Sequence, residues 1–390
     1  CARVEEEMSE SASRDAAEGT VEHTCGVCGA LFPSKNKLFK HLKGGGDCAK
    51  LSGHAIPAHL MPAEPSAEEL EGTYVYVVGG RERGHTLGFV ERYSVARQEW
   101  EKCPHMIEQR GSHGAAAVCG KLYAFSGGGV DSNTGTCECM EPSTHQWHYV
   151  GGMATKRHAL SAVASAQVIY AVGGWADGSR CMPDLEVYDP ALDTWSPGTP
   201  MLLPRRLHGV ALLDRHLYAF GGASDKQVDI KDAERYDMDS GRWERIGDLP
   251  SPSCASAAAA GGYIFVMLWG KQVYRFDPRA GDAGSYTKVG PLPLPEWYGF
   301  ALAPVGNDIY VFGGSTKGRW TNQAWRFDTR SLVWHTLPPM TSVRRRCAAA
   351  ACFLPPDTPP LPHLPPSLNA AVRSGDVLPA TTEAHLSVSS

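Results

Sequence analysis

The chain has 390 residues, of which 43% are hydrophobic and 20% charged, and its formal net charge is −5 at pH 7. This composition is typical of a globular protein with a large core, and the negative charge argues against a general nucleic-acid coat. No apolar run approaches the roughly 18 residues that are needed to span a bilayer.

The N-terminal residues 1–22 are rich in glutamate, alanine and serine, and we expect them to form a disordered acidic lead. The sequence begins with Cys1 instead of methionine, which indicates a fragment or an incomplete gene model. A targeting segment upstream of Cys1 would therefore be invisible.

A pair of cysteines marks the next segment. Cys25 and Cys28 are followed by Phe32, Leu38 and His41. These spacings resemble those of a two-cysteine, two-histidine zinc finger of the ββα type. The resemblance implies that the phenylalanine and leucine form a miniature core and that zinc supplies most of the folding free energy.

The fourth zinc ligand departs from the family pattern. In place of the second histidine, the chain offers Cys48 after a glycine triplet, 44–46, which would end the helix and let the chain fold back. We therefore expect Cys25, Cys28, His41 and Cys48 to bind zinc. His54 is the alternative fourth ligand, and a chance pair of cysteines in a disordered lead is the alternative to any finger.

The helix of the finger suggests what it contacts. By resemblance to fingers that bind DNA, the positions facing the bases are Ser34, Lys37 and Lys40. Lysines favour phosphate over base sequence, and one finger covers only about three base pairs. We rank contact with protein or RNA, or a structural role, above sequence-specific DNA binding.

A repeat dominates the rest of the chain. We assign residues 23–50 to the finger and 51–72 to a Pro/Ala linker. After the linker, an apolar stretch that ends on two glycines, or in one copy on Trp-Gly, recurs every 44 to 48 residues. The six copies end at Gly79-Gly80, Gly127-Gly128, Gly173-Gly174, Gly221-Gly222, Trp269-Gly270 and Gly313-Gly314.

Each double glycine is followed by a polar loop, an apolar stretch and, in most copies, a tryptophan. These tryptophans are Trp100, Trp147, Trp195, Trp243 and Trp334. The fifth copy has no such tryptophan, and Tyr286 is the candidate to replace it.

A methionine with an arginine four residues later, and then a strand of small residues, completes the unit. The period and the paired glycines resemble the kelch repeat, over about 73–354. The resemblance implies an all-β, six-bladed kelch propeller, in which glycine lets neighbouring blades approach. The small-residue strand 346–354 is an orphan, and we expect it to complete the blade that begins at Tyr74.

Strand order places the loops after the glycines and the arginine connections on one face of the ring. In kelch-like rings the first strands lie innermost, so we expect their arginines to surround the central opening. The predicted partner-binding residues are Arg81, Arg110, Arg157, Trp175, Arg205, Trp297, Arg319, Trp320 and Arg344. Arginine and tryptophan are typical of binding hot spots, and a protein or acidic peptide is the expected partner. The alternative is that each arginine pairs with a neighbouring carboxylate or carbonyl group and fixes its own loop.

Two functional classes follow. The favoured one is a non-enzymatic adaptor or scaffold, with the propeller binding one partner and the finger a second partner or nucleic acid. Many kelch proteins are substrate receptors of ubiquitin ligases, although the adaptor domain expected there is absent from this sequence. The alternative is a kelch enzyme, of the oxidase or sugar epimerase type, in which His113 and His208 reach the opening as ligands or bases.

The remaining features concern compartment and tail. The chain has 12 cysteines, and those outside the finger mostly lie in apolar strands, which favours a reducing cytoplasmic or nuclear location. Residues 355–390 begin with a proline-rich stretch and are expected to be extended and disordered. The stretch contains P-x-x-P spacings that fit polyproline-reading modules, and a plain spacer is the simpler interpretation.

Overall fold

The computed structural model describes residues 70–128, 133–142, 144–176 and 180–354, together with 358, 361 and two short strands near the N-terminus. The chain divides into two compact units, Cys1–Met61 and Pro62–Ser390. Within the described part, no helix is long and apolar enough to cross a membrane.

The first unit contributes one described hairpin. Strand β1 (His23–Thr24) pairs antiparallel with β2 (Leu31–Phe32), so that His23 lies opposite Phe32. The residues expected to bind zinc or nucleic acid lie outside the described residues: Cys25, Cys28, Ser34, Lys37, Lys40, His41 and Cys48.

The described residues of the second unit form six four-stranded antiparallel sheets, which we number in chain order. Sheet 1 consists of β33 (Ala348–Phe353), β3 (Thr73–Val78), β6 (Val90–Ser94) and β7 (Glu99–Cys103). Sheet 2 consists of β8 (Gly114–Val118), β9 (Lys121–Phe125), β10 (Cys137–Glu141) and β11 (Gln146–Val150). Sheet 3 consists of β13 (Ser161–Ala164), β14 (Ile169–Val172), β17 (Leu185–Asp189) and β18 (Thr194–Pro197).

The second half of the unit repeats this pattern. Sheet 4 consists of β19 (Gly209–Leu213), β20 (His216–Phe220), β21 (Ala233–Asp237) and β22 (Arg242–Ile246). Sheet 5 consists of β23 (Ala255–Ala260), β24 (Tyr263–Leu268), β25 (Gln272–Asp277) and β26 (Ser285–Pro291). Sheet 6 consists of β27 (Ala301–Val305), β28 (Asp308–Phe312), β31 (Ala324–Asp328) and β32 (Val333–Leu337).

Short strands occupy the loops between the second and third strands of sheets 1, 3 and 6, and one lies in the connection before sheet 3. They are β4 (Arg81–Glu82), β5 (His85–Thr86), β12 (Arg157–His158), β15 (Trp175–Ala176), β16 (Arg180–Cys181), β29 (Ser315–Thr316) and β30 (Arg319–Trp320). The all-β fold expected from the sequence is therefore confirmed for the second unit.

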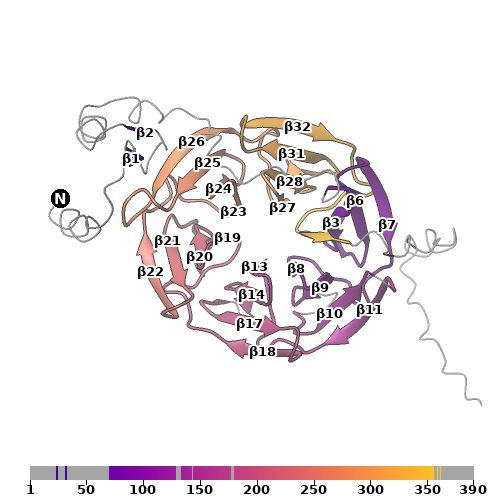
Figure 1. Ribbon diagram of the computed structural model, residues 1–390. Coiled ribbons are helices and arrows are strands. Elements are labelled where there is room, and N and C mark those ends of the chain that lie inside the picture. The colour runs from indigo at the N-terminus through magenta and orange to yellow at the C-terminus, as the bar shows by residue number, and fades with distance from the viewer. Residues whose placement is uncertain are drawn as a thin grey trace, which may run out of the picture. The chain divides into compact units, whose positions relative to one another are not determined.

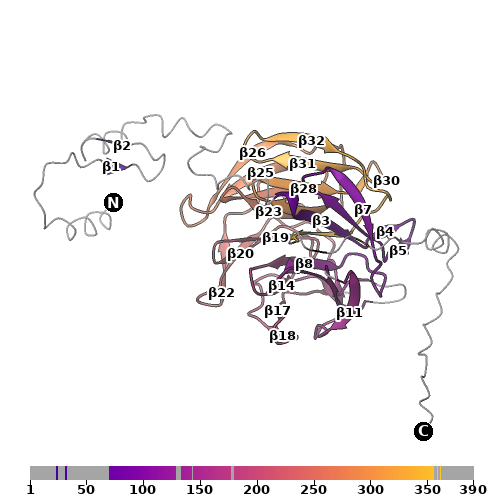
Figure 2. The same cartoon turned by 45° about the vertical axis from the view of Figure 1, so that its right-hand side comes forward.

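The six sheets form a ring, with their first strands innermost and their fourth strands outermost (Figure 1). The innermost strands contact one another in the order β8, β13, β19, β23, β27 and β33, and β33 returns to β8. Sheet 1 joins the two ends of the ring, because β33 pairs with β3 from Thr73 opposite Phe353 to Val78 opposite Ala348. Figure 2 shows β3 within the ring from a second direction.

The sequence explains why these strands occupy these places. The innermost strands are rich in alanine, such as "ASAAAA" in β23 and "AAAACF" in β33, since little room is left where six sheets converge. The second strands carry larger apolar residues and are almost fully buried. Their side chains fill the layers between neighbouring sheets, as Tyr76 and Leu122 do between sheets 1 and 2.

The double glycine allows two sheets to meet closely. Gly79 and Gly80 have positive φ angles of 52° and 109°, and the N–H of Gly80 donates to the carbonyl oxygen of Arg110 at 2.8 Å. A Cβ atom added to Gly79 would lie 2.5 Å from that same oxygen. The expected role of glycine in close approach is confirmed at this position.

The tryptophan of the fourth strand links its sheet to the preceding one. The indole N–H of Trp195 in sheet 3 donates to Gly151 O at 2.9 Å, and that of Trp100 in sheet 1 donates to Pro338 O at 2.7 Å. In sheet 5 the hydroxyl of Tyr286 donates to Gly247 O at 2.8 Å. Tyr286 therefore replaces the missing tryptophan, as the sequence suggested.

The pairing of β33 with β3 leads to a first prediction. Deleting residues 342–390 removes the innermost strand of sheet 1 and leaves β3 with an unpaired edge. We expect this variant to aggregate or to lose cooperative thermal unfolding, measured by circular dichroism and size-exclusion chromatography. A control that lacks only 362–390 should keep its melting temperature within about 2 °C. Equal melting of the two variants would show that the ring does not depend on this pairing.

Candidate binding face

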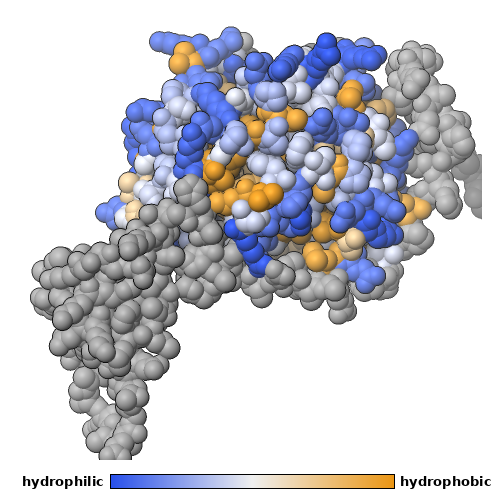
Figure 3. Space-filling view, turned by 90° about the horizontal axis from the view of Figure 1, so that it is seen from above, coloured by the Kyte–Doolittle hydropathy of each residue, from blue (hydrophilic) through white to orange (hydrophobic). Residues whose placement is uncertain are grey.

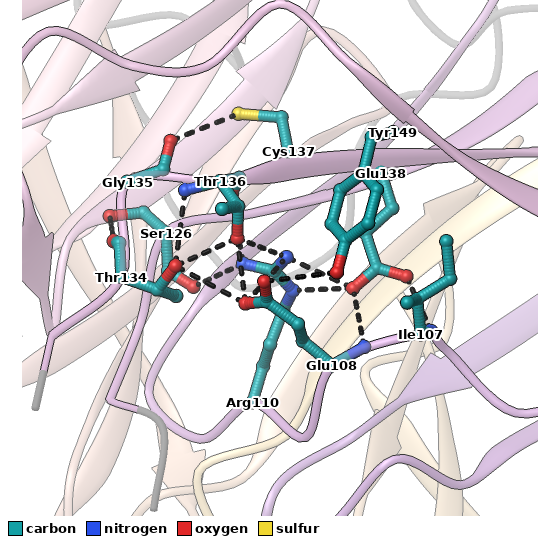
Figure 4. Close-up of polar contacts among 10 residues, drawn as sticks. All are labelled: Ile107, Glu108, Arg110, Ser126, Thr134, Gly135, Thr136, Cys137, Glu138 and Tyr149. Carbon is teal, nitrogen blue, oxygen red and sulfur yellow. Dashed lines mark hydrogen bonds and ion pairs between the residues drawn. The ribbon is translucent and has the colours of Figure 1, made fainter. Parts of the chain in front are cut away.

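Arg110 was expected at the surface, and this expectation is wrong. Its side chain is fully buried and forms an ion pair of 2.9 Å with Glu138, which is also fully buried. Its Nη1 atom donates to Ser126 O at 3.0 Å and to Thr136 O at 2.8 Å (Figure 4). The guanidinium group therefore has its partners inside the protein and none of its surface is left for a ligand.

Glu138 extends this network to the connection that precedes Arg110. Its carboxylate accepts the backbone N–H groups of Ile107 at 2.6 Å and Glu108 at 3.1 Å (Figure 4). Burial raises the pKa of Glu138, and the charge of Arg110 opposes that rise. The pair thus ties the connection between two sheets to the second and third strands of sheet 2.

The same arrangement recurs in three other sheets. Arg157 pairs with Glu186 at 3.0 Å, Arg205 pairs with Glu234 at 2.5 Å, and Arg344 pairs with Glu91. All four arginines have 0% relative exposure. The expected contact of Arg110, Arg157, Arg205 and Arg344 with a partner is therefore corrected, because each guanidinium fixes its own loop.

Trp297 is corrected for the same reason. It is fully buried, and its indole N–H donates to Gly313 O at 2.7 Å. Arg205 makes the equivalent bond, from Nη1 to Gly221 O at 2.9 Å. In sheet 6 the tryptophan thus takes the structural place that an arginine holds in sheets 1 to 4.

A sequence signal for this burial was available. A glutamate stands in the third strand of each sheet that has a buried arginine, and sheets 5 and 6 lack both residues together. Tyr274 and Trp325 occupy the glutamate position there, while Ser253 and Trp297 occupy the arginine position. The joint presence and joint loss of the two charges indicates an ion pair.

We call the end of the ring that carries the double glycines and the arginine connections the glycine face. On it, backbone hydrogen bonds link the sheets around the axis at the second residue after each arginine. The N–H of Ser112 donates to Arg346 O at 2.9 Å, that of Ala159 to Ser112 O at 2.7 Å, and that of Leu207 to Ala159 O at 3.0 Å. The N–H of Arg346 donates to Gly299 O at 2.7 Å. We call this series of backbone hydrogen bonds around the axis the belt.

Four partly exposed arginines lie at this belt and form what we call the axial arginine cluster: Arg81, Arg206, Arg345 and Arg346. Arg81 and Arg345 are held together by two backbone hydrogen bonds, of 2.9 and 3.2 Å. The guanidinium carbon of Arg206 lies 4.1 Å from the ring centre of Trp175, and that of Arg345 lies 5.0 Å from the ring centre of Trp320.

The cluster is electrostatically unusual. Burial lowers the pKa of Arg346, and the positive charges of the other three members lower it further. Within the described ranges, no side-chain hydrogen bond or ion pair joins these four guanidinium groups to any residue. Some arginines elsewhere on the surface have acidic neighbours, as Arg215 has Asp239 and Arg326 has Asp308 at 3.1 Å, whereas the exposed Arg180 and Arg242 share the lack of an ion pair in the described structure.

The structure thus brings together only part of the predicted face. Arg81, Trp175 and Trp320 lie in or against the cluster, and Arg319 is exposed on β30 beside Trp320. Sequence reasoning missed Arg206, Arg345 and Arg346. These three arginines share one feature of the sequence, which is that each follows a buried arginine, Arg205 or Arg344, by one or two residues.

Two histidines weighed as catalytic candidates are packing residues. His113 and His208 are both buried, and neither ring has a hydrogen-bond partner. Burial lowers both pKa values, that of His113 to about 3. Among the described residues, no group of three or more histidine, cysteine or acidic side chains could hold a metal ion.

Figure 3 shows one side of the ring. Hydrophobic residues there form patches between strongly hydrophilic ones (Figure 3). Large exposed hydrophobic residues are spread over several sheets, such as Tyr149 in sheet 2 and Val333 in sheet 6.

Comparison with known proteins gives the family. Five segments match the family model described as Kelch motif, residues 72–107, 109–154, 156–202, 204–250 and 296–341, which together cover more than half of the chain. The stretch 251–295 between the last two contains sheet 5, in which the double glycine, the arginine and the tryptophan are all replaced.

The relatives share this repeat at low identity. Kelch-like protein 11 from Homo sapiens is 22% identical over 350 residues, 79% of this chain and 48% of the relative. Kelch-like protein 25 from Xenopus tropicalis is 27% identical over 215 residues, 51% of this chain and 36% of the relative. Kelch-like protein 26 from Danio rerio is 31% identical over 191 residues, 47% of this chain and 31% of the relative. The chain spans between about a third and half of the length of these relatives.

A solved structure supports the fold alone. "Structure of YjhT" has a TM-score of 0.57 and 12% sequence identity, and the match covers 72% of this chain and 100% of that chain.

The buried ion pairs lead to a second prediction. Glu234→Ala leaves the buried Arg205 without its carboxylate, and we expect a loss of about 3–5 kcal/mol in the free energy of unfolding. Urea denaturation measures this loss. Asp239→Ala is the matched control, because it breaks the exposed pair with Arg215 and should change stability little. Similar losses in both variants would contradict the structural role of the buried pair.

Proposed function

The chain belongs to the Kelch motif family, and we propose that it is a non-enzymatic protein-interaction adaptor whose glycine face binds an acidic segment of a protein partner. In this proposal the six sheets are the blades of a six-bladed kelch propeller, and β33 completes the first blade. The observation that carries the proposal is the axial arginine cluster, which has no acidic partner among the described residues.

Electrostatics supports an anionic partner. Two unit charges of like sign about 8 Å apart repel by about 2 kcal/mol at an effective dielectric constant near 20. An anion placed between them replaces repulsion by attraction on every side. Two of the guanidinium groups are also held against tryptophan rings, so that little side-chain freedom is lost on binding.

The relatives support the adaptor class. The matched proteins carry the printed name Kelch-like, and this chain spans only part of their length. A role beyond the propeller, such as recruitment of a bound partner to a ubiquitin ligase, remains a proposal. The enzyme alternative is disfavoured because its candidate bases, His113 and His208, are buried and face no solvent.

A third prediction tests the glycine face. The double variant Arg206→Glu/Arg345→Glu should lower the affinity for a fluorescent 12-residue pool of random acidic peptides at least tenfold, measured by anisotropy. Binding to the unchanged protein should weaken steeply as salt is raised. Arg215→Glu is the control, because this arginine is exposed in the turn between β19 and β20. Equal binding by the double variant and the control would contradict binding of the peptide at the glycine face.

We also propose that Cys25, Cys28, His41 and Cys48 bind zinc. Three thiolates and one imidazole are a donor set that zinc prefers in tetrahedral sites. The hairpin of β1 and β2 supports the proposal, because both cysteines of the pair lie in the sequence between these strands. Contact of this unit with a second partner or with nucleic acid, through Ser34, Lys37 and Lys40, belongs to the same proposal.

The zinc proposal gives a fourth prediction. The full chain should purify with about one zinc ion, measured by elemental analysis, and its cobalt-substituted form should show the absorption of a tetrahedral thiolate site. Cys48→Ser should weaken metal binding greatly, while His54→Ala should not. The opposite result would transfer the fourth ligand to His54, and a metal-free chain would contradict the finger.

A further inference from the structure

We propose that the acidic segment bound at the glycine face also carries proline residues, and that these prolines pack on Tyr298, beside the axial arginine cluster. This inference rests on the proposed function and narrows the class of partner to a proline-containing acidic peptide. It is drawn from the exposure of this tyrosine and from the contacts that hold it.

Tyr298 is an exposed aromatic residue on the glycine face. It has 44% relative exposure and directly follows the buried Trp297. In sheets 1 and 4 the equivalent position, one residue after the buried arginine, is held by Arg345 and Arg206. Sheet 6 thus presents an aromatic ring at the position where two other sheets present a guanidinium group.

Contacts on two sides hold Tyr298 in place. Its N–H donates to Ser315 O at 2.9 Å, and its carbonyl oxygen accepts the N–H of Ser315 at 2.8 Å. Its ring lies against Gly270, where an added Cβ atom would be 2.6 Å from both Cζ and the hydroxyl oxygen. Gly270 is the glycine that sheet 5 keeps, although Trp269 replaces the other one. The ring is therefore a preformed surface, and a ligand that packs on it costs little side-chain freedom.

The hydrogen-bonding groups around the ring favour a ligand backbone without N–H groups. The three successive carbonyl oxygens of residues 297–299 already accept backbone N–H groups, at 2.8, 2.8 and 2.7 Å. Within the described ranges, the hydroxyl of Tyr298 has no hydrogen-bond partner and can donate to a ligand. Proline has no N–H and leaves its carbonyl oxygen as an acceptor. Proline-rich segments also pack on aromatic rings in an extended conformation that they adopt before binding.

The arginine cluster lies beside this ring, so that prolines and acidic residues of one segment can be bound together. The N–H of Arg346 donates to Gly299 O at 2.7 Å, and a Cβ atom added to Gly299 would lie 3.5 Å from Cγ of Arg346. The side chain of Arg346 therefore starts beside the residue that follows Tyr298. Trp320, which carries Arg345 over its ring, lies one strand beyond the residue that pairs with Tyr298. Aromatic and cationic groups thus lie next to each other across sheets 6 and 1.

The test uses three pools of fluorescent 12-residue peptides that contain equal numbers of glutamates and are otherwise random, except for a central Pro-Pro, Ala-Ala or Ser-Ser pair. We expect the proline pool to bind the full chain at least fivefold more tightly than either other pool, measured by anisotropy. The alanine pool is the matched comparison, because it is apolar and restores the backbone N–H groups.

Variants locate the preference for proline. Tyr298→Ala should bind all three pools with similar affinity, whereas Tyr149→Ala, at a tyrosine of sheet 2 with 53% exposure, should keep the preference. Arg346→Ala should weaken all three pools by a similar factor, because the pools carry equal charge. Thermal unfolding shows whether each variant is folded. If Tyr298→Ala unfolds, Tyr298→Gln removes the ring while it keeps a side chain over Gly270, and the same loss of preference is expected.

The outcomes separate this inference from the proposed function. Equal binding of the three pools by the unchanged protein, with weaker binding by Arg206→Glu/Arg345→Glu, would overturn the proline site and keep the acidic partner. A preference for proline that survives the loss of the Tyr298 ring would overturn the site proposed for the prolines. Absence of all binding would overturn both the proline site and the proposed function.

Discussion

The pairing of β33 with β3 is the constraint on which the rest of the structure depends. It joins the end of the repeat to its beginning, so that sheet 1 is built from both. It also creates the candidate site, because Arg81 follows β3 and Arg345 precedes β33. Neither half of the chain contains the cluster by itself. The arginine cluster is therefore complete only when β33 pairs with β3.

Arginines that are neighbours in the sequence have two different environments. Arg205 and Arg344 turn into the ring, where a glutamate and backbone carbonyl groups take up their donors. Arg206 and Arg345 come one residue later and lie over the rings of Trp175 and Trp320, with no ion pair among the described residues. The buried pairs fix the loops rigidly, and the loops then present the next side chain. A rigid inner shell thus orients the residues that a partner would contact.

Much of the fold followed from the sequence, since each repeated residue has one physical task. The paired glycines, the small-residue strands and the replacement by Tyr286 all concern the fit of neighbouring backbones, which repeats at a fixed period. The candidate site was harder to predict. A period shows that Arg205 recurs, yet it does not show which way the side chain points. The glutamates of the third strands carried that information, and positions such as Arg346, outside the repeat pattern, had no signal except their place near the axis.

Sheets 5 and 6 show what the buried pair contributes elsewhere. Each lacks the arginine and the glutamate, and aromatic residues take over part of their role, as Trp297 does by its bond to Gly313. A tryptophan can supply one N–H where an arginine supplies several, so fewer carbonyl groups are tied to the connection. The glycine face is therefore asymmetric, with its loops fixed by ion pairs in sheets 1 to 4. All four arginines of the cluster stand on connections or loops of these sheets, which places the proposed site on the more firmly held side of the ring.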